Sequence, residues 1–309
     1  MKKQSYHLSI GFLVATLLLT AGLNAEAQTK PETSIKTLTL GGVSQDPREP
    51  VEEHFRPLAA YAARKLSPSG ETMGAVIVAP NAAQMMKLLE EKRVDFYLES
   101  PYPTYVINRL GAATLLLRRW KSGMAEYRSL IFTGKESGIA RLEDLRGKII
   151  AFEDPGSTSG YFLPKLFLLK KGLSLVEKPS LGAKVAAGEI GYIFTGTEKN
   201  VVNLVLQKKV AGGAFSNDDH ASLDEKSKAA IAILGESESM PRHLVSVRKD
   251  LPEPVIKRLK EILLSMHQDD EGQKILRQTG NTTKFDSLPG GEELVRRKLV
   301  ELYRPRGNK

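Results

Sequence analysis

Short apolar runs alternate with segments of helical period through most of the chain. The run at residues 37–40 ends in two glycines, and residues 51–66 then place their apolar side chains at helical spacing. The same succession recurs at residues 75–91, where a β-branched run ends at Pro80 and Asn81 can cap the next helix. Such alternation is typical of parallel sheets covered by helices, so the sequence predicts an α/β fold.

A second α/β series begins near residue 149, and a strand-like run at residues 243–248 precedes the helical C-terminal part. Two such units joined by a return crossing predict two lobes with a ligand cleft between them. The expected parts are a signal peptide (1–27), lobe 1 (28–126), lobe 2 (127–238), and a return to lobe 1 with C-terminal helices (239–309).

The first residues have the composition of an export signal. Lys2 and Lys3 precede an apolar stretch at residues 8–19, and Ala25-Glu26-Ala27 gives the small-x-small cleavage pattern. The alternative is an uncleaved anchor, although the apolar stretch is short for a membrane span. The chain has no cysteine, so it forms no disulfide, thiolate nucleophile or lipid-bearing cysteine. We expect a protein secreted to the periplasm.

Charge and motifs disfavour several function classes. The formal net charge of +9 is spread along the chain without a dense basic run, which argues against nucleic acid as a partner and suits an anion ligand. The histidines lack metal-ligand spacing, and no serine sits in a G-x-S-x-G elbow. We therefore expect neither a metal, nor a cofactor, nor an enzyme.

The segment from Asp154 to Pro164, DPGSTSGYFLP, follows the apolar run at residues 149–152 and precedes a helical segment. A helix start offers unpaired N–H groups and a partial positive charge, and the three hydroxyls at residues 157–159 add donors. One interpretation is an oxyanion site. The other is that a serine merely caps the helix. Pro164 cannot donate within a helix, so the regular helix begins late or is kinked.

The chain resembles the phosphate, phosphite and phosphonate-binding proteins of ABC transporters, the PhnD-type family. The resemblance rests on VDFYLESPYPTYV, on LEDLRGKIIAFEDPGSTSGYFLP, on MPRHLVSVRKDLP and on the C-terminal EGQKILRQTGNTTKFDSL. It implies a two-lobed type 2 periplasmic binding fold, a small oxyanion ligand, and delivery to an ABC permease in the inner membrane. It also assigns the phosphoryl-holding role to Ser157, Thr158 and Ser159.

The sequence departs from the family pattern at two further segments. The family's Gly-Pro turn after the V-D strand is Ser100-Pro101 here, so Ser100 and Tyr102 either donate to the ligand or are plain turn residues. The family's lobe 2 histidine is replaced by Thr197 or Glu198, and the aspartate of its next V-D pair by Ala211. Glu198 favours a protonated or amine-bearing ligand, or it simply opens a helix.

Tyr127 and Trp120 flank the expected hinge, where either ring can cover the rest of the ligand or pack against its lobe. The predicted function is capture of a phosphonate, phosphite or phosphate for an ABC importer. The alternative is a sensing protein that presents the anion to a membrane histidine kinase. The predicted ligand-binding residues are Ser157, Thr158, Ser159, Ser100, Tyr102, Glu198 and Tyr127.

Overall fold

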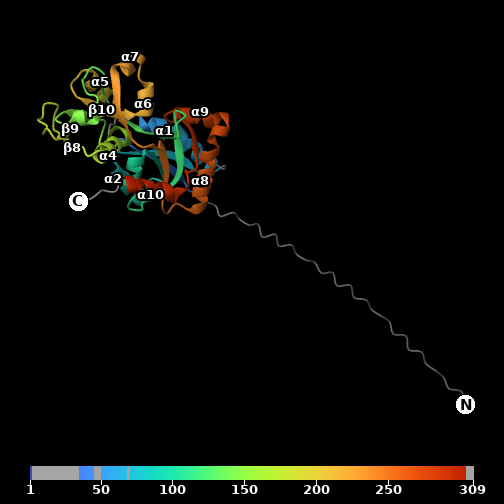
Figure 1. Cartoon of the computed structure of the whole chain (residues 1–309). Coiled ribbons are helices and arrows are strands. Elements are labelled where there is room, and N and C mark those ends of the chain that lie inside the picture. The colour runs from blue at the N-terminus through green and yellow to red at the C-terminus, as the bar shows by residue number, and fades with distance from the viewer. Residues whose placement is uncertain (2–34, 45–49, 68–69, 304–309) are drawn as a thin grey trace. The chain divides into compact units, whose positions relative to one another are not determined.

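The computed structural model describes Met1 and residues 35–44, 50–67 and 70–303. The predicted signal peptide and Asp46, which the sequence places on the loop after the first strand, lie outside these residues. The described chain forms two lobes, each built on a six-stranded sheet. In Figure 1, α1, α8 and α9 gather around one sheet, and α5, α6 and α7 around the other. The predicted two-lobed α/β fold is confirmed.

The first sheet combines the N-terminal strands with two strands from the C-terminal part. Its order is β14-β4-β13-β3-β1-β2. β1 pairs in parallel with β2 and β3, whereas β13 enters antiparallel between β3 and β4. The sheet is therefore mixed, not parallel as expected, because the returning chain crosses it in the opposite direction. The strands are β1 (Thr37–Val43), β2 (Met73–Ala79), β3 (Phe96–Glu99), β4 (Ala113–Lys121), β13 (His243–Arg248) and β14 (Thr282–Asp286).

The helices of this lobe bury apolar faces against the sheet. Asn81 caps α2 as predicted, since its side chain accepts the Gln84 N–H at 2.9 Å. Gly74 lets α1 approach β2 closely, because a Cβ there would lie 2.4 Å from the Ala59 carbonyl oxygen. The helices are α1 (Val51–Leu66), α2 (Ala82–Glu90), α3 (Pro101–Asn108), α8 (Glu253–Ser265), the 3₁₀ turn η3 (Met266–Gln268), α9 (Asp270–Gln278) and α10 (Glu292–Tyr303).

The second sheet has the order β11-β6-β10-β7-β9-β8. Strands β10, β7, β9 and the edge strand β8 are parallel, while β6 pairs antiparallel with β10 and β11, so this sheet is also mixed. The strands are β6 (Ser129–Gly134), β7 (Ile149–Phe152), β8 (Ser174–Glu177), β9 (Glu189–Phe194), β10 (Gly212–Ser216) and β11 (Ile231–Glu236). The helices are the 3₁₀ turn η1 (Leu142–Leu145), the π turn η2 (Thr158–Phe162), α4 (Leu163–Lys170), α5 (Glu198–Leu206), α6 (Asn217–Ser222) and α7 (Glu225–Ala230).

A two-stranded ribbon lies where the chain passes between the lobes. β5 (Glu126–Tyr127) pairs antiparallel with β12 (Met240–Pro241). The predicted lobe boundaries, after residues 126 and 238, fall in or beside this ribbon, and they stay a prediction. None of the helices within the described ranges is long and apolar enough to cross a membrane.

Candidate functional site

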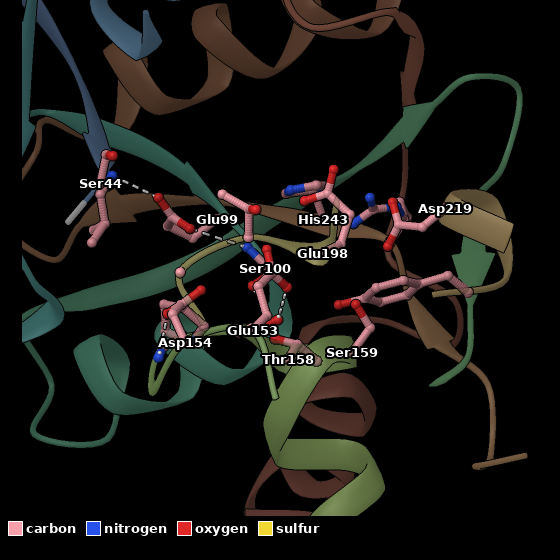
Figure 2. Close-up of a pocket in the computed structure, with 18 of the residues that line it drawn as sticks. Ser44, Glu99, Ser100, Glu153, Asp154, Thr158, Ser159, Glu198, Asp219 and His243 are labelled. Carbon is pink, nitrogen blue, oxygen red and sulfur yellow. Dashed lines mark hydrogen bonds between the residues drawn. The ribbon is translucent and has the colours of Figure 1, made fainter. Parts of the chain in front are cut away.

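A polar cavity of about 880 Å³ lies between the two lobes. Segments that follow β1, β3, β7 and β9 supply most of its wall, as expected for parallel strands whose carboxyl ends meet at one edge. Figure 2 shows Ser100, Glu153 and Thr158 close together, with Glu198, Asp219 and His243 around the same space. The lining residues are Val43, Ser44, Glu99, Ser100, Pro103, Lys121, Tyr127, Glu153, Asp154, Gly156, Ser157, Thr158, Ser159, Thr195, Gly196, Thr197, Glu198, Asn200, Asp219, Arg242 and His243.

The hydroxyl turn after β7 is held by its own side chains. The Asp154 carboxylate accepts the Gly156 N–H at 2.6 Å, and the Ser157 hydroxyl accepts the Gly160 N–H at 2.9 Å. The chain then makes the π turn η2 before α4 begins at Leu163. Pro164 thus lies in the first turn of α4, where a missing N–H costs nothing. Both sequence interpretations meet here, because Ser157 caps the helix and also lines the cavity.

Thr158 connects the two lobes across the cavity. It is buried, its hydroxyl donates to the Ser100 hydroxyl at 2.9 Å, and the same oxygen accepts the Tyr102 N–H at 2.9 Å. Ser100 acts as an acceptor in this contact. Among the described residues its hydroxyl has no acceptor of its own, so its hydrogen is available to a ligand. Hydroxyls from both lobes therefore converge at one point.

Ser159 and Tyr127 complete the hydroxyl-lined wall. The Ser159 carbonyl accepts the Ser129 hydroxyl at 2.6 Å, which fixes the turn to β6. The Tyr127 hydroxyl is buried and has no hydrogen-bond partner among the described residues. Burial raises the pKa of Tyr127, so the phenol stays a neutral donor. The Arg242 guanidinium lies 4.4 Å from the centre of the Tyr127 ring and holds it in place.

Tyr102 lies elsewhere, and this corrects the expectation that its side chain faces the ligand. Its ring stacks on Phe162 with a centroid distance of 3.8 Å and packs against Tyr303. Tyr102 lies on the first turn of α3, and its half-buried ring packs against the apolar cluster that includes Leu163 and Tyr303. Only the backbone N–H of Tyr102 reaches the site, through Thr158. The other six predicted residues all line the cavity; their binding role stays a prediction.

A second helix begins at the same edge of the lobe 2 sheet. Thr197 caps α5, since its hydroxyl accepts the Asn200 N–H at 3.2 Å. Glu198 is the first residue of α5 and lines the cavity. A carboxylate at this position is stabilised by the helix dipole. Glu198 therefore opens the helix and faces the ligand space, so the two interpretations drawn from the sequence coexist.

The cavity is acid-rich although the whole chain is basic. Five acidic side chains line it, against the two basic side chains Lys121 and Arg242. The Arg242 guanidinium is compensated by buried Asp218, whose carboxylate accepts its Nε–H at 2.9 Å. Burial, with the nearby Arg242 and Arg119, lowers the pKa of Lys121. The local field thus suits a ligand that carries a positive group beside its anion. The five acidic side chains are Glu99, Glu153, Asp154, Glu198 and Asp219.

Sequence reasoning missed several lining residues. Glu153 directly follows β7, so the rule that sites lie beyond the carboxyl ends of strands would have found it. No such signal marks Lys121, Arg242 and His243, which come from the crossing between lobes. Burial and neighbouring cations lower the pKa of His243, which is neutral, and its Nδ1 has no partner among the described residues. Within the described ranges, no group of three or more His, Asp and Glu side chains can hold a metal.

Comparisons with known proteins agree with this geometry. A family model described as "ABC transporter, phosphonate, periplasmic substrate-binding protein" matches residues 40–288. The chain is 30% identical to XAC2383 from Xanthomonas citri, solved with ATP, over 87% of this chain and 96% of that chain, with a TM-score of 0.78. It is 18% identical to PhnD1 from Prochlorococcus marinus, solved with methylphosphonate, over 87% and 97% of the two chains, with a TM-score of 0.65.

A phosphonate-transporter binding protein from Pseudomonas aeruginosa, PA3383, has the same fold, at 17% identity over 89% of this chain and 91% of that chain, with a TM-score of 0.63. Two lobes around a polar cavity define a type 2 periplasmic binding protein. The chain belongs to the family of periplasmic phosphonate-binding proteins of ABC transporters. The resemblance read from the sequence is thereby confirmed, and the comparisons give the sensing alternative no support.

Proposed function

We propose that this protein captures a small phosphorus oxyanion in the cavity between its lobes and that the hydroxyl turn after β7 holds the phosphoryl group. The observation that carries the proposal is the convergence of hydroxyls from both lobes at Thr158 and Ser100. Neutral donors at a helix start stabilise an anion without a full cation. Methylphosphonate in the related PhnD1 supports the ligand class.

The acid-rich wall narrows the ligand to one that also carries a cationic amine. A bare dianion would be repelled by Glu198 and by the other carboxylates of the cavity. An aminoalkylphosphonate places its anion at the hydroxyl turn and its ammonium against these carboxylates. We therefore take 2-aminoethylphosphonate as the preferred probe. Phosphate, phosphite and methylphosphonate should bind more weakly.

Capture requires the two lobes to close on the anion, as in other two-lobed binding proteins. Residues 1–27 export the chain as a cleaved signal peptide, and residues 28–126, 127–238 and 239–309 make lobe 1, lobe 2 and the return to lobe 1. The loaded protein then delivers its ligand to an ABC permease in the inner membrane. No catalytic step is part of this role.

A nucleoside triphosphate is the second candidate ligand. XAC2383, 30% identical over most of both chains, was solved with ATP. The cavity of about 880 Å³ is larger than a small phosphonate needs. The same carboxylates that favour an amine oppose a polyanion such as ATP, so we place it second.

A thermal-shift screen of residues 28–309 tests the proposal, because a ligand that binds the folded state raises the melting temperature. The panel contains 2-aminoethylphosphonate, methylphosphonate, phosphite, phosphate, sulfate and ATP at pH 6.5. The expected result is the largest shift with 2-aminoethylphosphonate and none with sulfate. A shift with ATP alone would replace the proposal by the nucleotide candidate. No shift with any phosphorus compound would overturn both.

A further inference from the structure

Glu153 is a buried carboxyl group fixed inside the hydroxyl turn. Its backbone N–H donates to the Gly160 carbonyl at 3.2 Å, and its own carbonyl accepts the Gly196 N–H at 2.7 Å. Its side chain lies against the backbone of Gly160, where an added Cβ would sit 2.4 Å from Glu153 Oε2. Glu153 is thus wedged between the hydroxyl turn and the turn that precedes α5, and it lines the cavity.

The hydrogen atoms of this turn can be counted. Ser157 Oγ accepts the Gly160 N–H at 2.9 Å and donates its single hydrogen to Glu153 Oε2 at 2.6 Å. With Glu153 ionised, the Ser157 hydroxyl therefore has no hydrogen left for an anion. With Glu153 protonated, the carboxyl O–H can donate to the second lone pair of Ser157 Oγ. The serine hydrogen is then released toward the cavity.

The surroundings of Glu153 favour its protonated form. Burial is the main cause that raises the pKa of Glu153 from 4.5 to about 8. The hydrogen bond from Ser157 opposes this rise, and the carboxylates Asp154, Asp219 and Glu198 add to it. The other charged or titratable groups of the cavity are Glu99, Lys121, Tyr127, Arg242 and neutral His243. Arg242 is engaged by Asp218. No ion pair joins Glu153 to a cation within the described part of the chain.

We propose that Glu153 must carry a proton for Ser157 to donate to the phosphoryl group, so that capture of the anion takes up a proton at Glu153. This inference rests on the proposed function, because it assigns the phosphoryl group to the hydroxyl turn. An ionised Glu153 both withholds the serine hydrogen and repels the anion, and the two effects have the same sign. Glu153 thereby makes anion affinity depend on pH.

The linkage has a defined direction. The free protein loses the Glu153 proton as pH rises, whereas the anion-bound protein retains it to higher pH. Affinity is therefore complete below the pKa of free Glu153 and falls about tenfold per pH unit above it, until the bound form also ionises. A Glu153→Gln side chain donates from its amide N–H₂ to Ser157 Oγ at every pH. That variant should bind with no such loss.

The test is isothermal titration of residues 28–309 with 2-aminoethylphosphonate between pH 6.5 and pH 9.5. The ligand also changes its protonation over this range, but this effect cancels when the dissociation constant of wild type is divided by that of Glu153→Gln at each pH. The expected ratio of dissociation constants is near one at pH 6.5 and about thirtyfold at pH 9.5 if the bound form keeps its proton. A ratio that does not change with pH would overturn the proposal. Glu177→Gln is the matched control, since Glu177 ends β8 in the same sheet outside the cavity, and it should follow wild type.

Two further measurements separate the possible failures. In a Ser157→Ala background, Glu153→Gln should improve binding at pH 9.5 less than it does with Ser157 present. An equal improvement would mean that Glu153 acts only as a repelling charge, and would overturn the proposal that its proton releases the Ser157 hydrogen.

A ¹³C titration of the glutamate carboxyls, assigned with Glu153→Gln, needs no ligand. A midpoint near 8 supports the proposal, and an ordinary midpoint overturns it even where phosphonate binds. Absence of binding by any phosphorus compound at pH 6.5 would instead overturn the proposed function.

Discussion

Two helix starts lie side by side at one edge of the lobe 2 sheet, and they differ in chemistry. The strands that lead into them, β7 and β9, are parallel neighbours, with Phe152 opposite Phe194. Both starts are capped by a hydroxyl, Ser157 in the first and Thr197 in the second. After the first cap come Thr158 and Ser159, which are buried donors. After the second comes the carboxylate of Glu198.

The difference shows that a helix start does not by itself make an anion site. At α5 the chain supplies its own negative charge, so the dipole is already compensated by Glu198. At the hydroxyl turn the acid behind the cap is Glu153, whose pKa is raised by burial to about 8, so that it is largely neutral at pH 7. The Asp154 carboxylate of the same turn accepts the Gly156 N–H. The first start can therefore take an external anion, and the second is suited to the positive end of the same ligand.

The largest effect is expected from Glu153→Gln, which removes the buried acid behind the hydroxyl turn. The folded protein holds the Glu153 proton up to about pH 8, whereas the unfolded chain loses it near 4.5. The contribution of the Glu153 proton to wild-type stability is therefore fully present below pH 4.5, and it is lost as pH rises through about 8. Glu153→Gln cannot ionise, so its free energy of unfolding at pH 9 should exceed that of wild type by on the order of 5 kcal/mol. Urea unfolding at pH 5 and pH 9 measures this, and a difference independent of pH would refute it.

Thr158→Val tests the first start directly. The substitution keeps the side-chain shape and removes the hydroxyl that donates to Ser100 and so directs the Ser100 hydrogen toward the ligand. Binding of 2-aminoethylphosphonate should therefore weaken by about 1–3 kcal/mol. Titration calorimetry at pH 6.5 gives the change. Unaltered affinity would mean that the turn only caps the helix.

Thr197→Val is the matching change at the second start. It removes the hydroxyl that accepts the Asn200 N–H, so the free energy of unfolding should fall by about 1 kcal/mol. Binding should change much less than in Thr158→Val. Chemical unfolding and calorimetry on the same sample separate the two effects. Equal losses of affinity in both variants would erase the distinction between the helix starts.

The smallest effect concerns selectivity at Glu198. Glu198→Gln removes a charge next to the proposed ammonium, so the preference for 2-aminoethylphosphonate over methylphosphonate should fall by about 1 kcal/mol or less. The readout is the ratio of the two dissociation constants, with the melting temperature as the control for folding. A lower melting temperature with an unchanged ratio would leave Glu198 as a helix-opening residue alone.

Local pattern was enough to predict the two lobes and the hydroxyl turn. Strand and helix periods are local, and Ser157, Thr158 and Ser159 lie in one motif after one strand. Strand direction could not be predicted from local pattern. The chain completes lobe 2 before β13 returns to the first sheet, where it pairs antiparallel with β3 and β4, so this sheet is mixed rather than parallel. The Tyr102 ring also depends on distant packing, since its partners Phe162 and Tyr303 come from other segments.

The acid-rich wall was equally hidden, because it is assembled from segments far apart in the chain. Glu99 ends β3, whereas Glu153 and Asp219 follow β7 and β10, and no local motif marks any of the three. Lys121 and Arg242 reach the cavity only through the pairing of β4, β13 and the β5–β12 ribbon. A basic chain with an acidic cleft can be recognised only after folding has placed these side chains together.

A crystal structure of residues 28–309 with 2-aminoethylphosphonate at pH 6.5 tests the central claim most directly. The account predicts phosphoryl oxygens within hydrogen-bond distance of Ser157, Thr158 and Ser159, and the ammonium nitrogen against the carboxylate of Glu198. A phosphonate bound with its ammonium at the hydroxyl turn, or bound outside this cavity, would contradict the account.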